Sequence, residues 1–120
     1  MRHFTELRVW QTAHTLAMAV FRLSLTFPQS QRFGITAQLQ RAALSVPTNI
    51  SEGAKRESAK EFARFLNIAE GSLAEVQYLL LAGRELQLGD ENAIEELERH
   101  AADLAKRLGA LKKAVRKQAA

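Results

Sequence analysis

The chain has no cysteine and only two prolines in 120 residues. Without cysteine there are no disulfides, no thiol catalysis and no thiolate metal sites, and this composition is typical of a reducing compartment. The longest stretch without Asp, Glu, Lys or Arg runs from Val9 to Phe21, and it contains Gln11 and His14. Because thirteen partly polar residues are too few to cross a bilayer, we expect a cytoplasmic protein with no membrane partner.

The residues that are abundant favour helices. Hydrophobic residues make up 47% of the chain and charged residues 25%, and Ala, Leu, Glu, Arg, Lys and Gln are frequent. These are strong helix formers, and 120 residues suffice to bury one core without metals or disulfides. We therefore expect a single all-α domain over residues 1–120.

Start and stop signals divide the chain into four helices, at about 7–26, 35–53, 59–88 and 91–117. The first is expected to stop before Pro28, which disfavours helix in the preceding residue. Ser58 and Glu61 form a capping-box pattern, Gly89 suits a left-handed cap, and Asp90 can cap the fourth helix. The short connections predict an antiparallel up-down-up-down four-helix bundle.

The apolar spacing differs between the helices. The fourth helix carries one narrow seam, formed by Ile94, Leu97, Ala101, Leu104, Leu108, Leu111 and Val115. The first and third helices carry wider apolar arcs than one stripe in a bundle requires. The leftover strip predicts a homo-oligomer interface on these two helices, with Leu16, Leu23, Ile68, Leu79 and Leu86 as its candidates.

Catalytic and metal-binding patterns were sought in the sequence without success. A di-iron bundle needs Glu three residues before His. In this chain that position holds Gln11 before His14 and Leu97 before His100. No nucleophile elbow, P-loop or dinucleotide fingerprint is present. We expect no catalytic residue, metal, cofactor or small-molecule substrate, and hence no enzyme. Gly71 and Ser72 are interpreted as small residues at a close helix contact.

The segment from Ser45 to Gly53 is the most distinctive. Pro47 interrupts a helical pattern and cannot donate to the carbonyl of Ala43, while Asn49 faces inward. In one interpretation Asn49 is a core amide bonded to the freed backbone, and Glu52 pairs with Arg56. In the other, the structural motif of Pro47, Asn49, Glu52 and Gly53 is a polar binding or assembly site.

Net charge is +4, and it is unevenly distributed. Residues 1–60 hold eight bases and three acids, whereas residues 61–120 hold nine bases and ten acids. The candidate phosphate contacts are Arg32, Arg41, Lys55, Arg56 and Lys60. The basic stretch after Leu104 is explained by complementarity to the helix dipole and by solubility. No aromatic residue interleaves the bases, which argues against single-strand readout.

Several motifs together resemble a known family. They include Phe33-Gly34-x-x-x-Gln38-Leu39-x-Arg41-Ala42-Ala43, Ser45-Val46-Pro47-x-Asn49-Ile50-x-Glu52-Gly53 and Glu61-Phe62-x-x-Phe65-Leu66-x-Ile68-Ala69-x-Gly71-Ser72-x-x-Glu75. From residue 4 to about 110 the chain resembles the four-helix-bundle proteins also called 23S ribosomal RNA intervening-sequence proteins. Gln31 departs from the family pattern, which often has Glu before the aromatic-Gly pair.

The resemblance implies an antiparallel bundle that assembles as a homopentamer. Some members are encoded within insertions in 23S ribosomal RNA genes, and the family is similar to a basic pentameric accessory protein of retroelements that associates with a reverse transcriptase and RNA. Our leading hypothesis is a non-catalytic oligomeric accessory protein that engages RNA or a ribonucleoprotein. The alternative is a protein-only interaction scaffold.

Overall fold

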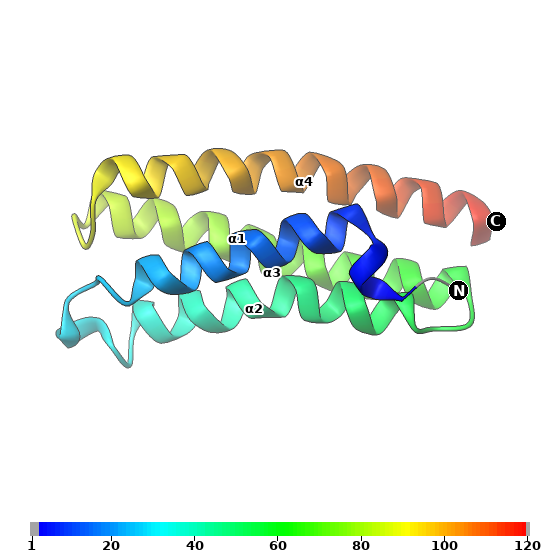
Figure 1. Cartoon of the computed structure of the whole chain (residues 1–120), viewed down its shortest axis with the longest axis horizontal. Coiled ribbons are helices and arrows are strands. Elements are labelled where there is room, and N and C mark those ends of the chain that lie inside the picture. Colours follow the sequence, from blue (N-terminus) through cyan, green and yellow to red (C-terminus); the bar gives the residue numbers. More distant parts are fainter. Residues whose placement is uncertain (1–2, 120) are drawn as a thin grey trace.

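Four long helices run side by side along one axis of the molecule (Figure 1). The computed structural model describes residues 3–119, so residues 1, 2 and 120 of the expected domain lie outside the described residues. The helices are α1 (Arg8–Ser24), α2 (Ile35–Ala54), α3 (Ala59–Glu85) and α4 (Glu91–Ala119), with short 3₁₀ turns η1 (Phe4–Glu6) and η2 (Gln29–Gln31). Among the described residues, none of these helices combines the length and hydropathy needed to cross a membrane.

Successive helices are antiparallel neighbours, which confirms the predicted all-α bundle (Figure 1). Each of the pairs α1–α2, α2–α3 and α3–α4 is extensively packed, whereas α1 and α4 meet much more sparsely. One core joins all four helices, and Val20, Leu39, Leu66, Leu80 and Leu104 are completely buried in it.

Polar side chains begin two of the helices as the sequence predicts. The Ser58 hydroxyl accepts a hydrogen bond from the Glu61 amide at 3.1 Å, and the Asp90 carboxylate accepts one from the Ala93 amide at 2.9 Å. Each bond satisfies an amide that has no partner within its helix. The side chain of Glu61 binds the Arg64 guanidinium at 3.2 Å, so only the Ser58 half of the capping box is observed.

The end of α3 differs from the expectation. The helix stops at Glu85, and the residue in the left-handed conformation is Gln87, with φ of 57°. Gly89 is needed for a different reason, because a Cβ there would lie 2.9 Å from the ring of Phe27. The glycine therefore admits a buried aromatic ring from the α1–α2 connection, and the prediction of a glycine cap was wrong.

Helices α2 and α3 approach each other closely at Gly53. A Cβ on Gly53 would lie 2.7 Å from the Phe65 Cβ, so no larger residue fits without a shift. Nearer the middle, the hydroxyls of Ser45 and Ser72 form a hydrogen bond of 2.8 Å between the two helices. Gly71, in contrast, is exposed and a Cβ there would meet nothing within 4 Å. The expectation of a close contact thus holds at Ser72 and is wrong for Gly71.

Candidate functional site

The end of α4 lies beside the start of α3, and this register brings two basic segments together. Lys112 of α4 forms an ion pair with Glu70 of α3 and donates to the side chain of Asn67 at 3.3 Å. Because the helices are antiparallel, the turns of α4 after Lys112 continue alongside the first turns of α3. Segments that are about fifty residues apart in the chain therefore meet at one end of the bundle (Figure 1).

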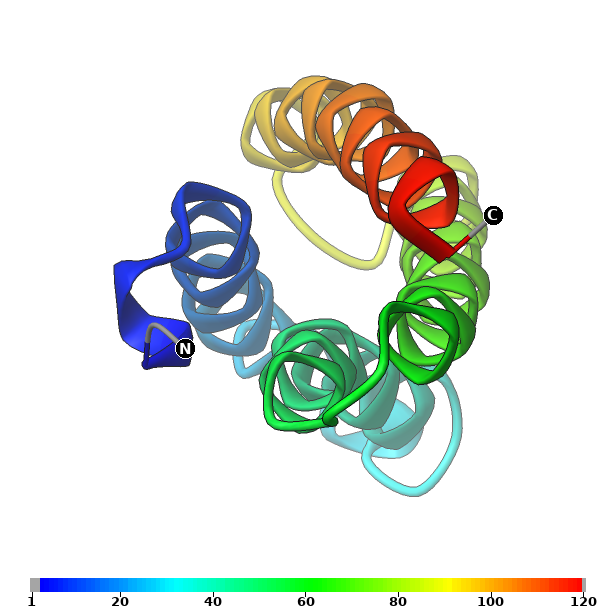
Figure 2. The same cartoon turned by 90° about the vertical axis from the view of Figure 1, so that its right-hand side faces the viewer.

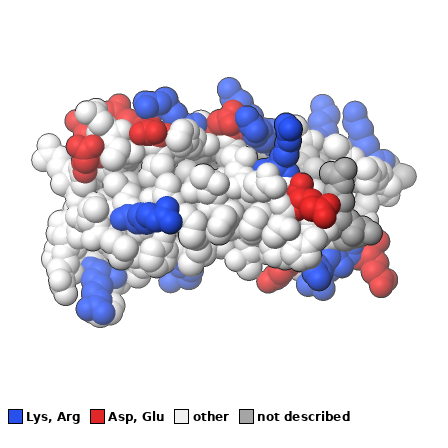
Figure 3. Space-filling view, in the orientation of Figure 1, with Lys and Arg blue, Asp and Glu red and all other residues white. Residues whose placement is uncertain are grey.

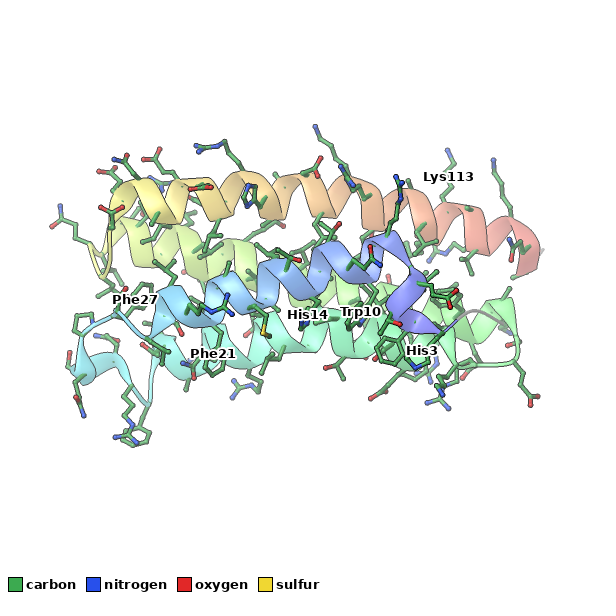
Figure 4. All side chains as sticks on the ribbon, in the orientation of Figure 1. His3, Trp10, His14, Phe21, Phe27 and Lys113 are labelled. Carbon is green, nitrogen blue, oxygen red and sulfur yellow. The ribbon has the colours of Figure 1, made fainter. Side chains whose placement is uncertain are left out.

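Six exposed cations gather at this end, which we call the basic end: Lys55, Arg56, Lys60, Lys113, Arg116 and Lys117. Within the described part of the chain, none of the six forms an ion pair with an acid. Their charges are therefore available to an external anion. Figure 4 shows Lys113 projecting from α4 away from the rest of the bundle.

Aromatic packing positions the guanidinium groups at the start of α3. Arg56 and Arg64 each lie 4.7 Å from the centre of the Phe65 ring, a distance typical of cation–π contacts. Glu61 also lies here, and the Arg64 guanidinium lowers the pKa of its carboxyl through a hydrogen bond and charge attraction. The expected Glu52–Arg56 pair is absent among the described residues, because Arg56 packs over Phe65 instead.

Acidic residues collect at the opposite end, over the first turns of α4. They are Asp90, Glu91, Glu95, Glu96 and Glu98, which we call the acidic end. Glu98 binds Arg84 of α3 at 2.7 Å, and this contact raises the pKa of the guanidinium further. Figure 3 shows acidic side chains over the start of α4 and basic ones over its end. Exposed Glu52 and Glu57 also lie beside Lys55 and Arg56, and Arg32 lies at the acidic end, so each end of the 46 Å bundle carries an excess of one sign of charge rather than one sign alone.

The five phosphate-contact residues predicted from the sequence do not lie at the same end of the bundle. Lys55, Arg56 and Lys60 lie together at the basic end. Arg32 lies in the α1–α2 connection at the other end of α2, and Arg41 lies nearer to that end. Since α2 has 20 residues, its length separates Arg32 from Lys55 by about 30 Å. The five residues therefore do not form one surface.

Sequence reasoning overlooked the contribution of Lys113, Arg116 and Lys117. These bases were assigned to the helix dipole and to solubility, because bases in the last turns of a helix complement its dipole. The signal that could have found them was the predicted antiparallel order of the third and fourth helices. In that order the last turns of one helix must lie beside the first turns of the other.

A stacked aromatic cluster flanks the start of α1 (Figure 4). Trp10 and His14 stack with their ring centres 5.0 Å apart, and Phe4 meets Trp10 edge-on at 5.0 Å. The order of residues along the chain does not indicate this cluster, because its rings do not lie between the bases in the sequence. His14 and His100 are exposed. No group of three or more metal-ligating side chains occurs in the described residues.

Asn49 forms hydrogen bonds within its own helix. Its side-chain amide donates to the carbonyl of Ser45 at 2.8 Å and to the Ser45 hydroxyl at 3.0 Å. α2 continues through Pro47, and the acceptor is not the Ala43 carbonyl that the sequence analysis had proposed. Asn49 is half-buried and belongs to a small polar network that reaches Ser72 of α3 through Ser45.

The five predicted interface residues differ in how far they are buried. Leu16 and Leu79 are each 6% exposed and belong to the core of the single chain, so they do not form an outward strip. Ile68 and Leu86 are exposed on the surface, and Leu23 is half-buried. Leu16 and Leu23 line a groove between α1 and α4. α4 lines the other side of this groove.

Comparisons with known proteins identify relatives by sequence and by fold. The family model of the 23S rRNA-intervening sequence proteins matches residues 5–110. A solved structure from Bacteroides thetaiotaomicron, described as a protein with unknown function from the S23 ribosomal protein family, superposes with a TM-score of 0.81. It is 23% identical and covers 88% of this chain and 98% of its own. A comparison with curated proteins gives no match.

Proposed function

Because the chain belongs to the 23S rRNA-intervening sequence protein family, we propose that it is a non-catalytic accessory protein that binds RNA. The basic end contacts backbone phosphates. The acidic end repels phosphates, so the RNA binds at the basic end only. The protein acts in the cytoplasm as a homo-oligomer, for which the family resemblance implies five copies.

The observation that supports this proposal is the clustering of six exposed cations without acidic partners in the described chain. Phosphate contacts of this kind dominate the affinity of proteins for nucleic acids. The stacked rings of Trp10 and His14 lie in the first turns of α1, on the same half of the molecule.

A salt titration tests the proposal. Binding of a structured ribosomal RNA fragment to the wild-type protein is measured by fluorescence anisotropy from low to physiological salt. If several phosphates are contacted, the logarithm of the association constant falls steeply and linearly with the logarithm of the salt concentration. No detectable binding at low salt would contradict the proposal.

A second candidate function is a protein-only scaffold, and the groove between α1 and α4 favours it. This groove offers a largely apolar surface that a protein partner could cover. In that case the basic end serves solubility only. The same titration separates the two candidates, because the scaffold shows no salt-dependent RNA binding.

A further inference from the structure

The sparse packing of α1 against α4 leaves a long groove on one side of the bundle. The view along the bundle shows these two helices standing apart, while the other neighbours are close (Figure 2). The groove has a volume of about 790 Å³, and Leu16, Ala19, Leu23 and Leu97 give it an apolar floor. Its polar rim consists of Arg22 on α1, with Glu96, His100 and Asp103 on α4.

A protruding aromatic side chain lies on another face of the same molecule. Phe33 is 88% exposed, more than any other large hydrophobic residue in the described chain. Its connection is not a loose loop, because the amides of Gln31, Arg32 and Gly34 all bond to preceding carbonyls at 2.9–3.1 Å. The guanidinium of Arg32 lies 5.2 Å from the Phe33 ring, so a cation accompanies the aromatic ring.

The groove and the Phe33 connection lie on different sides of the bundle. Figures 1 and 2 place the connection between α1 and α2 on the α2 side, away from the gap between α1 and α4. A molecule therefore cannot fill its own groove with this connection. The connection is nevertheless level with the end of the groove formed by Leu23, Thr26 and Ala93, because both lie at the same end of the bundle.

The charges of the two surfaces are complementary. Asp103 on the rim already binds Arg107 at 3.0 Å, but Glu96 has no ion-pair partner among the described residues. Arg32 likewise contacts no acid within the described chain. Since Arg22 on the α1 rim repels a second guanidinium, the favourable position for Arg32 of another copy is the α4 rim, beside Glu96.

We propose that Phe33 of one copy inserts into the α1–α4 groove of the next copy, with Arg32 against Glu96. This inference rests on the proposed homo-oligomer and names the surfaces that build it. Two different surfaces meet in such a contact, so it is heterologous and closes into a ring when the rotation between copies allows it. Copies joined at the same level lie parallel, and their basic ends then face the same side, where several can engage one RNA.

Two single variants test the two surfaces separately. Each substitutes an exposed residue, so the bundle should stay folded. Phe33→Ser removes the inserted side chain, and Thr26→Arg places a charged, longer side chain at the end of the groove that is level with the Phe33 connection. Light scattering after size exclusion should show each variant falling from the wild-type mass to the 13.4 kDa of one chain, with unchanged circular dichroism. Tyr78→Ser, which removes another exposed aromatic, should keep the wild-type mass.

Mixing the variants gives the most specific outcome. Phe33→Ser retains its groove and Thr26→Arg retains its Phe33, so an equimolar mixture can form one contact only. It should give a dimer of twice the chain mass and nothing larger. In the same assay, Arg32→Glu and Glu96→Arg should each raise the dissociation constant of the oligomer at least tenfold. Their combination should restore the wild-type value.

The outcomes distinguish this inference from the proposed assembly itself. A wild-type oligomer that persists in Phe33→Ser and Thr26→Arg would overturn the groove contact while leaving the oligomer intact. A mixture that stays monomeric although each parent variant is folded would also overturn it. A wild-type monomer at micromolar concentration would overturn both.

Discussion

Gly53 and Gly71 are both glycines within helices, but their surroundings are opposite. At Gly53 any Cβ collides with Phe65 and Phe62, whereas at Gly71 the space is empty. Helical glycine costs about 1 kcal/mol relative to alanine, so only one of these costs is offset by packing. The sequence shows two glycines in helical patterns, and nothing local to either one reveals the neighbouring helix.

We therefore predict that Gly53→Ala destabilises the bundle and Gly71→Ala does not. Overpacking of the α2–α3 contact should lower the free energy of unfolding by about 1–3 kcal/mol. Gly71→Ala, the matched control, should raise it by roughly 0.5–1 kcal/mol because the helix gains a better helix former. Urea unfolding measures both. Equal effects of the two substitutions would contradict the close approach at Gly53.

Asn49 gives a second prediction for a single residue. Its amide bonds the Ser45 carbonyl and hydroxyl and so supports the hydrogen bond from Ser45 to Ser72. Asn49→Ala should cost about 1 kcal/mol of unfolding free energy and leave the oligomeric mass unchanged. A variant of unchanged stability but altered mass by light scattering would instead assign Asn49 to assembly.

The helix termini illustrate what local sequence can and cannot predict. Side-chain caps act over three residues, so Ser58 and Asp90 were identified from the sequence alone. The end of α3 depends on the insertion of Phe27 between Gly83 and Gly89. Because Phe27 comes from a connection far away in the chain, the sequence could not indicate that Gly89 serves packing rather than capping.

The cap of α4 gives a prediction for a whole helix. Asp90→Ala removes the acceptor for the Ala93 amide and should lower the free energy of unfolding by about 1 kcal/mol. Asp90→Asn keeps an oxygen in the same position and should retain most of the stability. Thermal unfolding of the two variants measures this difference. If both variants lose the same amount, the side chain does not act as a cap.

The apolar spacing predicted the α4 seam correctly but placed Leu16 and Leu79 on an outward strip, whereas both are buried in the core of the single chain. Ile94, Leu104 and Leu108 of the seam are fully buried. α3 packs against both α2 and α4, so part of a wide apolar arc on this helix is covered within one chain. Spacing measures how much of a helix is apolar, but it does not show whether a neighbour in the same chain or another copy covers it.

At the scale of the whole molecule, the distribution of charge differs from its distribution along the chain. Counting by halves of the sequence placed the excess of bases in residues 1–60. The antiparallel fold instead joins the α2–α3 connection to the end of α4 and concentrates the acids at the other end. The candidate site could be predicted only in part, since Lys113, Arg116 and Lys117 come from a distant segment.

The central claim is that the basic end binds RNA, and position rather than net charge should decide the affinity. One triple variant changes Lys113, Arg116 and Lys117 to Gln. A matched control changes Arg22, Arg41 and Arg99 to Gln, which removes the same charge from exposed positions away from the basic end. RNA affinity of both proteins is measured across a salt series, with circular dichroism to confirm folding.

The slope of the logarithm of the association constant against the logarithm of salt concentration gives the result. For the structured RNA, with one phosphate contacted by each of the three side chains, the basic-end variant should reduce the steepness of the slope by about 2–3. The control should keep nearly the wild-type slope. If both variants change the slope equally, or if neither changes it, the basic end is not the RNA-binding surface.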